Sequence, residues 1–376
     1  MKNIIAFSAG DIKASSLTRS ITSRTNKKNV LSVLFIVILL SFIPNLLHAQ
    51  GPGAGWNYYR VVTLSPATTL ANQQVEVTLA AGQYTNMKSD GSDLRFYDNA
   101  NNNCEYWIES WNNTGTSTIW VKVPTSGSDA LVLYYGNASA TAVSNGSATF
   151  DFFDDFIGSS LGTNWQQNTS GGSVSVSAGI ATITCSTNST GQAYISSEYT
   201  PAGTSYLLEA KHQEGAYNRN RFYASNSLFG GSPTGFDYGY FSENTTAQSS
   251  AKIFWNGYPT STSMTSNTNY LTQWRITDGS TYNWYTYLYS SGAAVTNGSR
   301  TTTVAGNMRY ITFGVTEVSG TTTKLDWVRL RQYVATEPAA TIGSQTSNTA
   351  PSNPITYSGS GYFIVPDGVT SITVEC

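Results

Sequence analysis

Three short segments of this 376-residue chain combine aromatic rings with amide or charged side chains. They are Tyr217-Asn218-Arg219-Asn220-Arg221, Phe236-Asp237-Tyr238-Gly239-Tyr240 and Trp255-Asn256-Gly257-Tyr258. Tyr and Trp rings have an apolar body and a polar tip. They can therefore stack on the C–H faces of sugar rings while neighbouring amides and carboxylates bind the hydroxyl groups. This combination predicts a carbohydrate-binding cluster.

The run from Tyr282 to Tyr289 adds a fourth aromatic set. As a β-strand it places Trp284 on one face and Tyr285, Tyr287 and Tyr289 on the other, because successive side chains alternate. We predict that the glycan contacts come from five residues, namely Trp255, Tyr258, Trp284, Tyr217 and Tyr238. The alternative is that most of these rings fill the interior, since aromatic residues dominate the burial of cores.

The motifs of common enzyme classes are missing from the sequence. His212 is the only histidine after residue 49, and no Gly-x-Ser-x-Gly motif, P-loop or dinucleotide fingerprint accompanies it. Cys104, Cys185 and Cys376 lie too far apart in sequence to indicate a zinc site. Cys104 and Cys185 either form a disulfide in an oxidising compartment or remain two buried free thiols.

The composition favours strands and excludes some partners. Charged residues make up 11% of the chain, against about 25% in an average soluble protein. Residues 1–49 hold six of the 20 basic and one of the 22 acidic residues, so the rest carries a net charge of −7. An acidic chain without a basic run is not expected to bind nucleic acid or anionic membranes. The many aromatic and β-branched residues suit pleated sheets.

The N-terminal segment has the layout of a secretory signal peptide. Lys27 and Lys28 precede an apolar run from Val30 to Ile43, and the small residue Ala49 follows. The run is shorter than the about 20 residues of a membrane span. We therefore expect a protein that is secreted or lies on the outer cell surface, with no membrane span after cleavage. An uncleaved anchor is the alternative.

The remainder reads as short alternating runs separated by turn clusters, as in Val75-Glu76-Val77-Thr78-Leu79, which predicts an all-β chain. Repeated strands at this spacing favour a β-sandwich followed by a larger two-sheet jelly roll. The expected parts are a signal peptide (1–49), a linker (50–55), a β-sandwich (56–149), a jelly roll (150–335), a second linker (336–354) and the start of a further β domain (355–376). Because the last part ends inside a strand pattern, we expect a piece of a longer protein.

Ordered motifs across residues 55–156 resemble those of domain-of-unknown-function family 2341. They are Trp56-x-Tyr58-Tyr59-Arg60, Ser92-Asp93-Leu94-Arg95-Phe96, Tyr106-Trp107-Ile108-Glu109-Ser110, Trp120-Val121-Lys122-Val123-Pro124, Tyr134-Tyr135-Gly136-Asn137 and Phe152-Phe153-Asp154-Asp155-Phe156. The resemblance implies an extracellular β-sandwich of large bacterial surface proteins. It implies no known catalytic residues.

Residues 150–335 resemble the concanavalin-like lectin and glucanase jelly rolls. The resemblance rests on Phe153-Asp154-Asp155-Phe156, Trp165 and Leu325-Asp326-Trp327-Val328-Arg329-Leu330. It implies that the first and last strands lie together and share a structural Ca²⁺, an ion that takes 6–8 oxygen ligands. The predicted ligands are Asp154, Asp155 and Asp326. The alternative is that these carboxylates cap strands or bind Arg or backbone N–H groups. No cofactor is required.

Laminarinase-type glucanases begin and end in a similar way and use a Glu-x-Asp-x-x-Glu strand. The nearest segment here is Glu209-Ala210-Lys211-His212-Gln213-Glu214, in which Lys211 replaces the Asp. That cation would lower the pKa of both neighbouring carboxyl groups. A retaining pair lies about 5–5.5 Å apart, yet residues five apart in a regular strand face opposite sides unless a bulge intervenes. We therefore predict no catalytic residues and a protein that is not an enzyme.

Two further resemblances concern the ends of the chain. Tyr362-Phe363-x-Val365-Pro366-x-Gly368-Val369-Thr370 resembles the opening strands of a glycine-rich repeat domain of bacterial secreted proteins. The leader ending in His48-Ala49-Gln50 is similar to those of Bacteroidetes-type bacteria. The resulting hypothesis is a secreted or surface-attached bacterial module whose jelly roll binds a polysaccharide or cell-surface glycan. A structural or adhesive spacer with no small ligand is the alternative, and a glycoside hydrolase is third.

Overall fold

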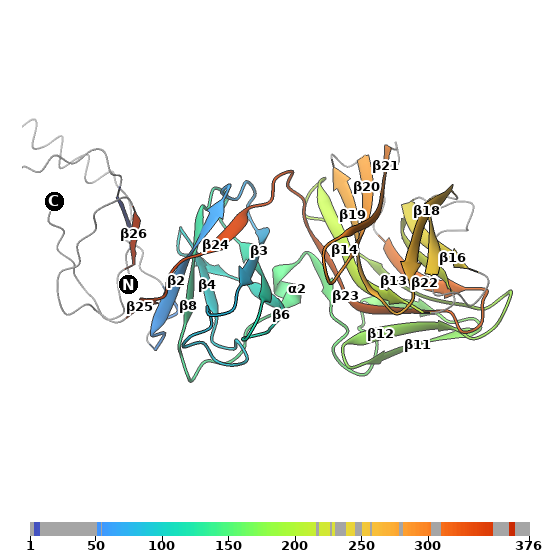
Figure 1. Ribbon diagram of the computed structural model, residues 1–376, viewed down its shortest axis with the longest axis horizontal. Coiled ribbons are helices and arrows are strands. Elements are labelled where there is room, and N and C mark those ends of the chain that lie inside the picture. The colour runs from blue at the N-terminus through green and yellow to red at the C-terminus, as the bar shows by residue number, and fades with distance from the viewer. Residues whose placement is uncertain are drawn as a thin grey trace, which may run out of the picture. The chain divides into compact units, whose positions relative to one another are not determined.

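The computed structural model (Figure 1) describes residues 4–7, 51–53, 55–215, 218–225, 228–229, 238–244, 250–255, 258–277, 281–301, 310–348 and 361–364. The chain divides into two units. The second unit is Asn145–Glu337, and the first consists of the residues on both sides of it. The regular structure in these ranges is β-sheet apart from one helical turn, α2 (Gly146–Thr149). The predicted all-β class is confirmed.

The first unit is a sandwich of two antiparallel sheets. One sheet has the order β3 (Gln73–Leu79), β7 (Ser117–Val123), β6 (Tyr106–Ser110). The other has the order β24 (Ala339–Ile342), β2 (Tyr58–Ser65), β8 (Ala130–Tyr135), β4 (Arg95–Asp98), β5 (Asn103–Cys104), with β25 (Thr346–Ser347) also on β2. In β3 the side chains of Val75, Val77 and Leu79 are buried and those of Glu76 and Thr78 are exposed. This alternation places one face of each sheet on the common core.

The sequence prediction of a linker over residues 336–354 is wrong. β24 pairs with Val62 to Ser65 of β2, and β25 pairs with Tyr58 and Tyr59 of the same strand. The Tyr135 hydroxyl donates a hydrogen bond to Gln345 Oε1 at 3.0 Å. The Thr/Ser-rich composition hid these strands because they are short edge strands with little buried apolar surface. The second unit is therefore an insertion in the first.

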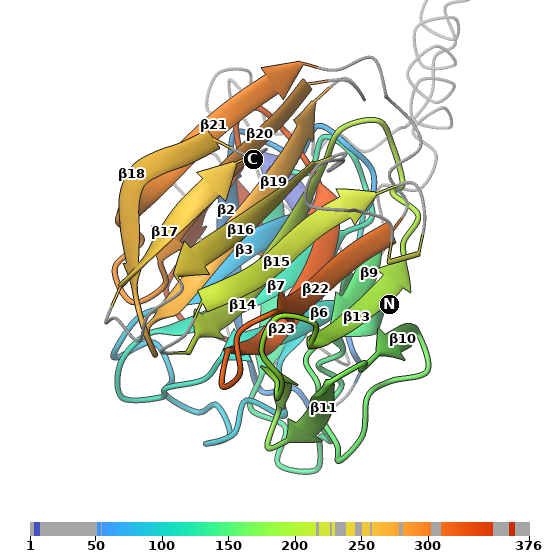
Figure 2. The ribbon, with the colours of Figure 1, turned by 90° about the vertical axis from the view of Figure 1, so that its right-hand side faces the viewer.

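The second unit is a larger sandwich of two antiparallel sheets (Figure 2). The seven-stranded sheet has the order β10 (Trp165–Asn168), β13 (Gln192–Glu198), β22 (Tyr310–Thr316), β15 (Asn218–Ser225), β16 (Tyr238–Asn244), β17 (Ser250–Trp255), β18 (Tyr258–Thr265). The eight-stranded sheet has the order β11 (Gly172–Ser177), β12 (Ile180–Cys185), β23 (Thr322–Gln332), β14 (Tyr206–Glu214), β19 (Asn269–Thr277), β20 (Thr281–Leu288), β21 (Ala294–Thr301), with β9 (Phe152–Asp154) paired to β23. This is the two-sheet jelly roll that the sequence predicts.

An aromatic core joins the two sheets of the second unit. The ring centroids of Phe222 and Phe313 lie 5.0 Å apart, and Trp165 and Trp274 pack against Phe313 at 6.1 and 6.4 Å. Pairing of Asp154 with Val328 sets the first strand, β9, beside the last strand, β23. The outer face of the eight-stranded sheet, meaning the face turned away from this core, holds the candidate site.

Three other sequence expectations concern the thiols, the leader and the C-terminal segment. Cys104 and Cys185 are buried free thiols, and burial raises the pKa of Cys104 well above its ordinary value. Cys104 and Cys185 therefore do not form a disulfide with each other, and the alternative of two free thiols is confirmed. β1 (Ile4–Phe7) pairs with β26 (Gly361–Ile364), and the rest of residues 1–50 and 349–376 lies outside the described part. Within that part, no helix has the length and apolar character to cross a membrane.

Candidate functional site

The strand β20 separates its aromatic residues between two faces. Trp284 belongs to the core cluster and is 1% exposed, whereas Tyr285 and Tyr287 are half-buried on the outer face. The prediction of Trp284 as a glycan contact is therefore wrong in this conformation, because its ring packs in the interior. The predicted strand is present, and of its two faces the tyrosine face is the one that is partly exposed.

Three tyrosines form what we call the tyrosine row, namely Tyr285, Tyr287 and Tyr289. The rings of Tyr285 and Tyr287 have their centroids 6.1 Å apart with an interplanar angle of 13°. Lys211 Nζ lies 4.2 Å from the centroid of the Tyr289 ring. Arg275 Cζ lies 4.6 Å from the Tyr285 centroid and 4.9 Å from that of Tyr333. Lys211 and Arg275 thus each lie beside a ring of this surface.

The register of the sheet explains why these groups meet. Across β14, β19 and β20, Glu209 pairs with Gln273 and Gln273 with Tyr285. In the next row, Arg275 lies between Leu207 and Asn283. Directly paired residues in antiparallel sheets share a face. The half-buried amides Gln273 and Asn283 therefore belong to the same surface as the tyrosine row.

Sequence reasoning missed Arg275, Gln273 and Tyr333 as members of this surface. The available signal was the alternation of β19, where Gln273 and Arg275 alternate with the buried residues Trp274 and Ile276. That pattern predicts an outward polar pair. It does not reveal that Tyr333, at the end of another strand, supplies the second ring against Arg275.

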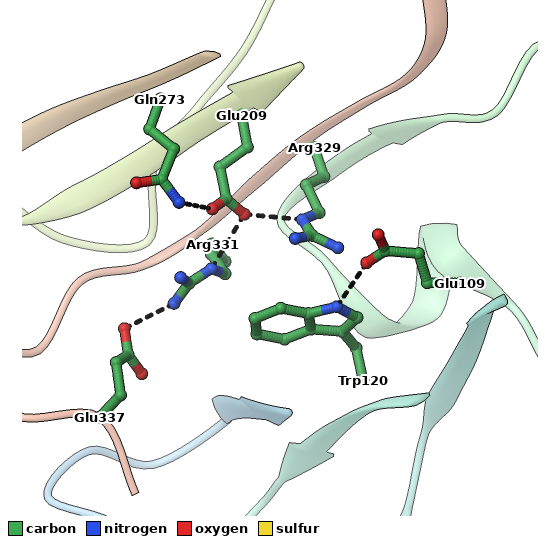
Figure 3. Close-up of polar contacts among 7 residues, drawn as sticks. All are labelled: Glu109, Trp120, Glu209, Gln273, Arg329, Arg331 and Glu337. Atoms are coloured by element: carbon green, nitrogen blue, oxygen red, sulfur yellow. Dashed lines mark hydrogen bonds and ion pairs between the residues drawn. The ribbon is translucent and has the colours of Figure 1, made fainter. Parts of the chain in front are cut away.

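Glu209 lies at the centre of a buried ion network on the same sheet (Figure 3). Its Oε2 accepts from Arg329 Nε at 2.6 Å and from Arg331 Nε at 3.0 Å, and its Oε1 accepts from Gln273 Nε2 at 2.6 Å. Arg331 Nη1 also donates to Glu337 at 2.7 Å. Burial by itself would raise the pKa of Glu209, but the two guanidinium groups outweigh it and hold that pKa at about 2. Glu209 is therefore an ionised structural carboxylate, not a proton donor near neutral pH.

Glu214 lies on the core side of the same strand. Its Oε1 lies 2.7 Å from His212 Nδ1, and Thr323 Oγ1 donates to its Oε2 at 2.8 Å. The register of β14 with β19 is continuous from Tyr206 to Gln213. A register shift with β23 does occur beside Lys211 and His212, but the extra residue there is Asp326 of the partner strand. Glu209 and Glu214 therefore stay on opposite faces and do not form the close pair of a retaining glucanase.

Two of the three predicted calcium ligands have other partners in the structure, and their role as ligands stays a prediction. Asp154 accepts from Phe156 N and from Trp165 Nε1, both at 2.7 Å, so each of its oxygens already binds an N–H group. Asp326 Oδ2 lies 2.7 Å from Lys211 Nζ, and half-buried Asp155 directly follows β9. In the described part of the chain, no group of three His, Cys, Asp or Glu residues is placed to hold a metal ion. Asp154 thus accepts from a backbone N–H, as in the alternative, whereas the partner of Asp326 is a Lys and not an Arg.

The other four predicted glycan contacts remain predictions. Tyr217 lies outside the described residues, as do the side chains of Tyr238, Trp255 and Tyr258. The backbone places Tyr238 at the start of β16, and it pairs Trp255 with Tyr258 across the β17–β18 hairpin. These positions belong to the seven-stranded sheet. They are thus separate from the tyrosine row of the other sheet.

Comparisons with known proteins give one family match and several solved structures of low similarity. The model of a family described as "Domain of unknown function (DUF2341)" matches residues 90–168. The match begins inside the region of residues 55–156 that carries the resemblance and ends 12 residues after it. No curated protein matches. Among solved structures, the Ca²⁺-bound exoplasmic/lumenal domain of VIP36 has 11% identity and a TM-score of 0.35, covering 49% of this chain and 90% of that one.

Two other solved structures have similar values. The legume lectin-like domain from Entamoeba histolytica has 10% identity and a TM-score of 0.34, covering 46% of this chain and 91% of that one. A structure titled "Prominent members of the human gut microbiota express endo-acting O-glycanases to initiate mucin breakdown" has 15% identity and a TM-score of 0.34, covering 49% and 100%. At these values the similarity carries no conclusion about function. The family match is confined to residues 90–168.

Proposed function

We propose that the second unit binds carbohydrate, without catalysing a reaction, on the outer face of its eight-stranded sheet. The observation that carries this proposal is the half-buried, nearly parallel ring pair of Tyr285 and Tyr287, whose centroids lie 6.1 Å apart. Tyr rings combine a large apolar surface with a polar tip and lose little conformational entropy on binding. Such a pair suits the C–H faces of a sugar.

Polar groups beside the rings suit the hydroxyl groups of a sugar. The amides of Gln273 and Asn283 occupy the register positions next to the tyrosine row, and amides both donate and accept hydrogen bonds. Burial raises the pKa of the Tyr287 hydroxyl above its ordinary value of 10.0, against the opposing charge of Arg275. The phenol therefore remains a hydrogen-bond donor at all physiological pH values.

Binding rather than hydrolysis follows from the state of the carboxylates. Glu209 is held by two arginines and Glu214 by His212 and Thr323, and each is 1% exposed. Neither is accessible to a glycosidic bond. With the signal-like leader of residues 1–49, the proposal is a secreted or surface-attached bacterial module whose ligand is an external polysaccharide or cell-surface glycan.

The test is a binding measurement on an immobilised glycan panel. Tyr285→Ala and Tyr287→Ala should each weaken binding of a hit glycan by about tenfold or more, as removal of an aromatic anchor does. Tyr310→Ala is the matched control, because this half-buried tyrosine lies on β22 of the other sheet. Absence of glycan binding by the folded protein would reject the proposal and favour the structural spacer.

A further inference from the structure

We infer that the sugar bound at the tyrosine row is anionic, carries a carboxylate, and is recognised through Arg275. This inference rests on the proposed carbohydrate binding and narrows it to a ligand class. It depends on three observations. They are the two rings beside Arg275, the lack of an acidic partner for it among the described residues, and the Nη groups that are left for a ligand.

The guanidinium of Arg275 lies beside two aromatic rings. Its Cζ lies 4.6 Å from the Tyr285 centroid and 4.9 Å from the Tyr333 centroid. The planar guanidinium group stacks on aromatic faces, and this contact retains both its charge and its N–H donors. The two rings therefore fix the position of the cation without using its hydrogen-bonding capacity.

Arg275 differs from its cationic neighbours on the same face. Arg329 and Arg331 both bind Glu209, at 2.6 and 3.0 Å, and Lys211 binds Asp326 at 2.7 Å. Within the described residues, no ion pair joins Arg275 to an Asp or Glu, and its buried Nε has no hydrogen-bond partner. A half-buried cation without a counter-charge is costly. It becomes favourable when a bound anion supplies that charge.

The surroundings of Arg275 select the form of the anion. Its register neighbour on β14 is the apolar Leu207, which is 1% exposed, and its neighbour on β20 is Asn283. Within the described residues, the Nη groups of Arg275 donate no hydrogen bond and, unlike its Nε, are not buried, so the edge that they form is left for a ligand. A carboxylate matches that edge through two parallel hydrogen bonds. A sugar that carries a carboxylate could therefore stack its ring on Tyr285 and Tyr287 and bind the guanidinium of Arg275 through that carboxylate.

Polygalacturonate, its methyl ester and dextran sulfate are suitable probes, applied to the full chain in a calorimetric titration. The ester keeps the sugar backbone and removes the charge. We expect the protein to bind polygalacturonate about tenfold or more tightly than the ester, the ratio expected for one additional charge-assisted contact. Dextran sulfate should bind more weakly than polygalacturonate, because its sulfate groups do not present the planar carboxylate.

Arg275→Gln should abolish the preference for polygalacturonate over the ester, since it removes the charge-assisted contact. Arg275→Lys should keep a part of the preference that Arg275→Gln abolishes. Lys keeps the positive charge but lacks the two parallel N–H donors of the guanidinium. Lys324→Gln is the matched control, because Lys324 is a half-buried cation on β23 of the same sheet, and it should keep the preference. Thermal melts confirm that each variant is folded.

The other outcomes separate the two proposals. Equal binding of polygalacturonate and its ester, sensitive to Tyr285→Ala but not to Arg275→Gln, would overturn the role of Arg275 and leave carbohydrate binding intact. Stronger binding of dextran sulfate than of polygalacturonate would overturn the carboxylate assignment. If the folded protein bound none of these polymers and no glycan of the panel, the proposed function itself would fail.

Discussion

Among the individual residues, Glu209 is a buried carboxylate held by two arginines. It is 1% exposed, and Arg329, Arg331 and Gln273 surround its carboxylate. Desolvation of three charges is expensive, so the network is stable only while every partner is present. Glu209 also supports the tyrosine row. Gln273 donates a hydrogen bond to Glu209 and is paired with Tyr285 on the neighbouring strand.

Replacement of Glu209 by Gln should cost about 3–5 kcal/mol of stability at pH 7, because two buried arginines lose their counter-charge. The folded-state pKa of about 2 lies below the ordinary value of 4.5. The contribution of Glu209 is therefore present above pH 4.5 and is lost as the pH falls through about 2. Urea unfolding at several pH values measures this, and the difference between wild type and variant should narrow below pH 4.5.

The control for this experiment is the Lys211–Asp326 pair on the same face. Its side chains are 16% and 35% exposed, so Lys211→Gln should cost only about 0–1 kcal/mol. A difference between wild type and Glu209→Gln that does not change with pH would contradict the assignment of an ionised Glu209.

Trp284 and Tyr285 are adjacent in sequence but should respond differently to truncation. Trp284→Ala removes a core side chain and should destabilise the second unit by about 3–5 kcal/mol. Tyr285→Ala removes a half-buried ring and should cost about 1 kcal/mol or less, while weakening glycan binding. Thermal unfolding together with the panel measurement checks both, and a large loss of stability in Tyr285→Ala would argue against a surface role.

Among the secondary-structure elements, β14 and β23 show how one irregular position preserves the core. On β23, Leu325 and Val328 both belong to the core cluster although they are three residues apart. The extra residue Asp326 makes this possible, because a bulge shifts the alternation by one position. Lys211 and Asp326 consequently meet on the outer face at 2.7 Å.

The short strands β24 and β25 should be essential for the first unit. Truncation after Glu337 removes their pairing with β2, the bond from Tyr135 to Gln345, and the 2.6 Å bond from Asn348 Nδ2 to the Trp56 carbonyl. The unfolding transition of the first unit should therefore be lost or strongly lowered in calorimetry, while that of the second unit remains. Truncation after Asn348 is the control, and an unchanged first transition in the shorter chain would refute this role.

At the scale of the whole molecule, the second unit is an insertion whose two ends lie together. Asp151 N donates to the Leu330 carbonyl at 3.0 Å, and β9 pairs with β23. The unit also has a core cluster of its own, which is the condition for independent folding.

Residues 145–337 expressed alone should therefore unfold in one cooperative transition and keep the glycan affinity of the full chain within about twofold, since no residue of the proposed site lies elsewhere. Calorimetry and the glycan titration test this. A fragment without a cooperative transition would show that the second unit depends on the first.

Much of this architecture could be predicted from local patterns. The alternation of Val75, Val77 and Leu79 predicted β3, and the run from Tyr282 to Tyr289 predicted β20. Strands rich in Ser, Thr, Asn and Ala, such as β24, were not predicted, because their alternation carries little hydrophobic contrast. The calcium ligands came from the resemblance, which gave no sign that the indole of Trp165 donates a hydrogen bond to Asp154 at 2.7 Å.

The sequence by itself determined the strands and the division of their residues between two faces, because a strand has a side-chain period of two. Trp284 was therefore separated from Tyr285 and Tyr287 before any fold was known. Only the tertiary structure decided which of those faces is covered, since both faces of β20 are aromatic. It also decided the partners of each charge. Glu209 binds Arg329, 120 positions away in sequence, and Arg275 meets Tyr333 from another strand end, because sheet order, unlike strand pattern, depends on contacts between distant segments.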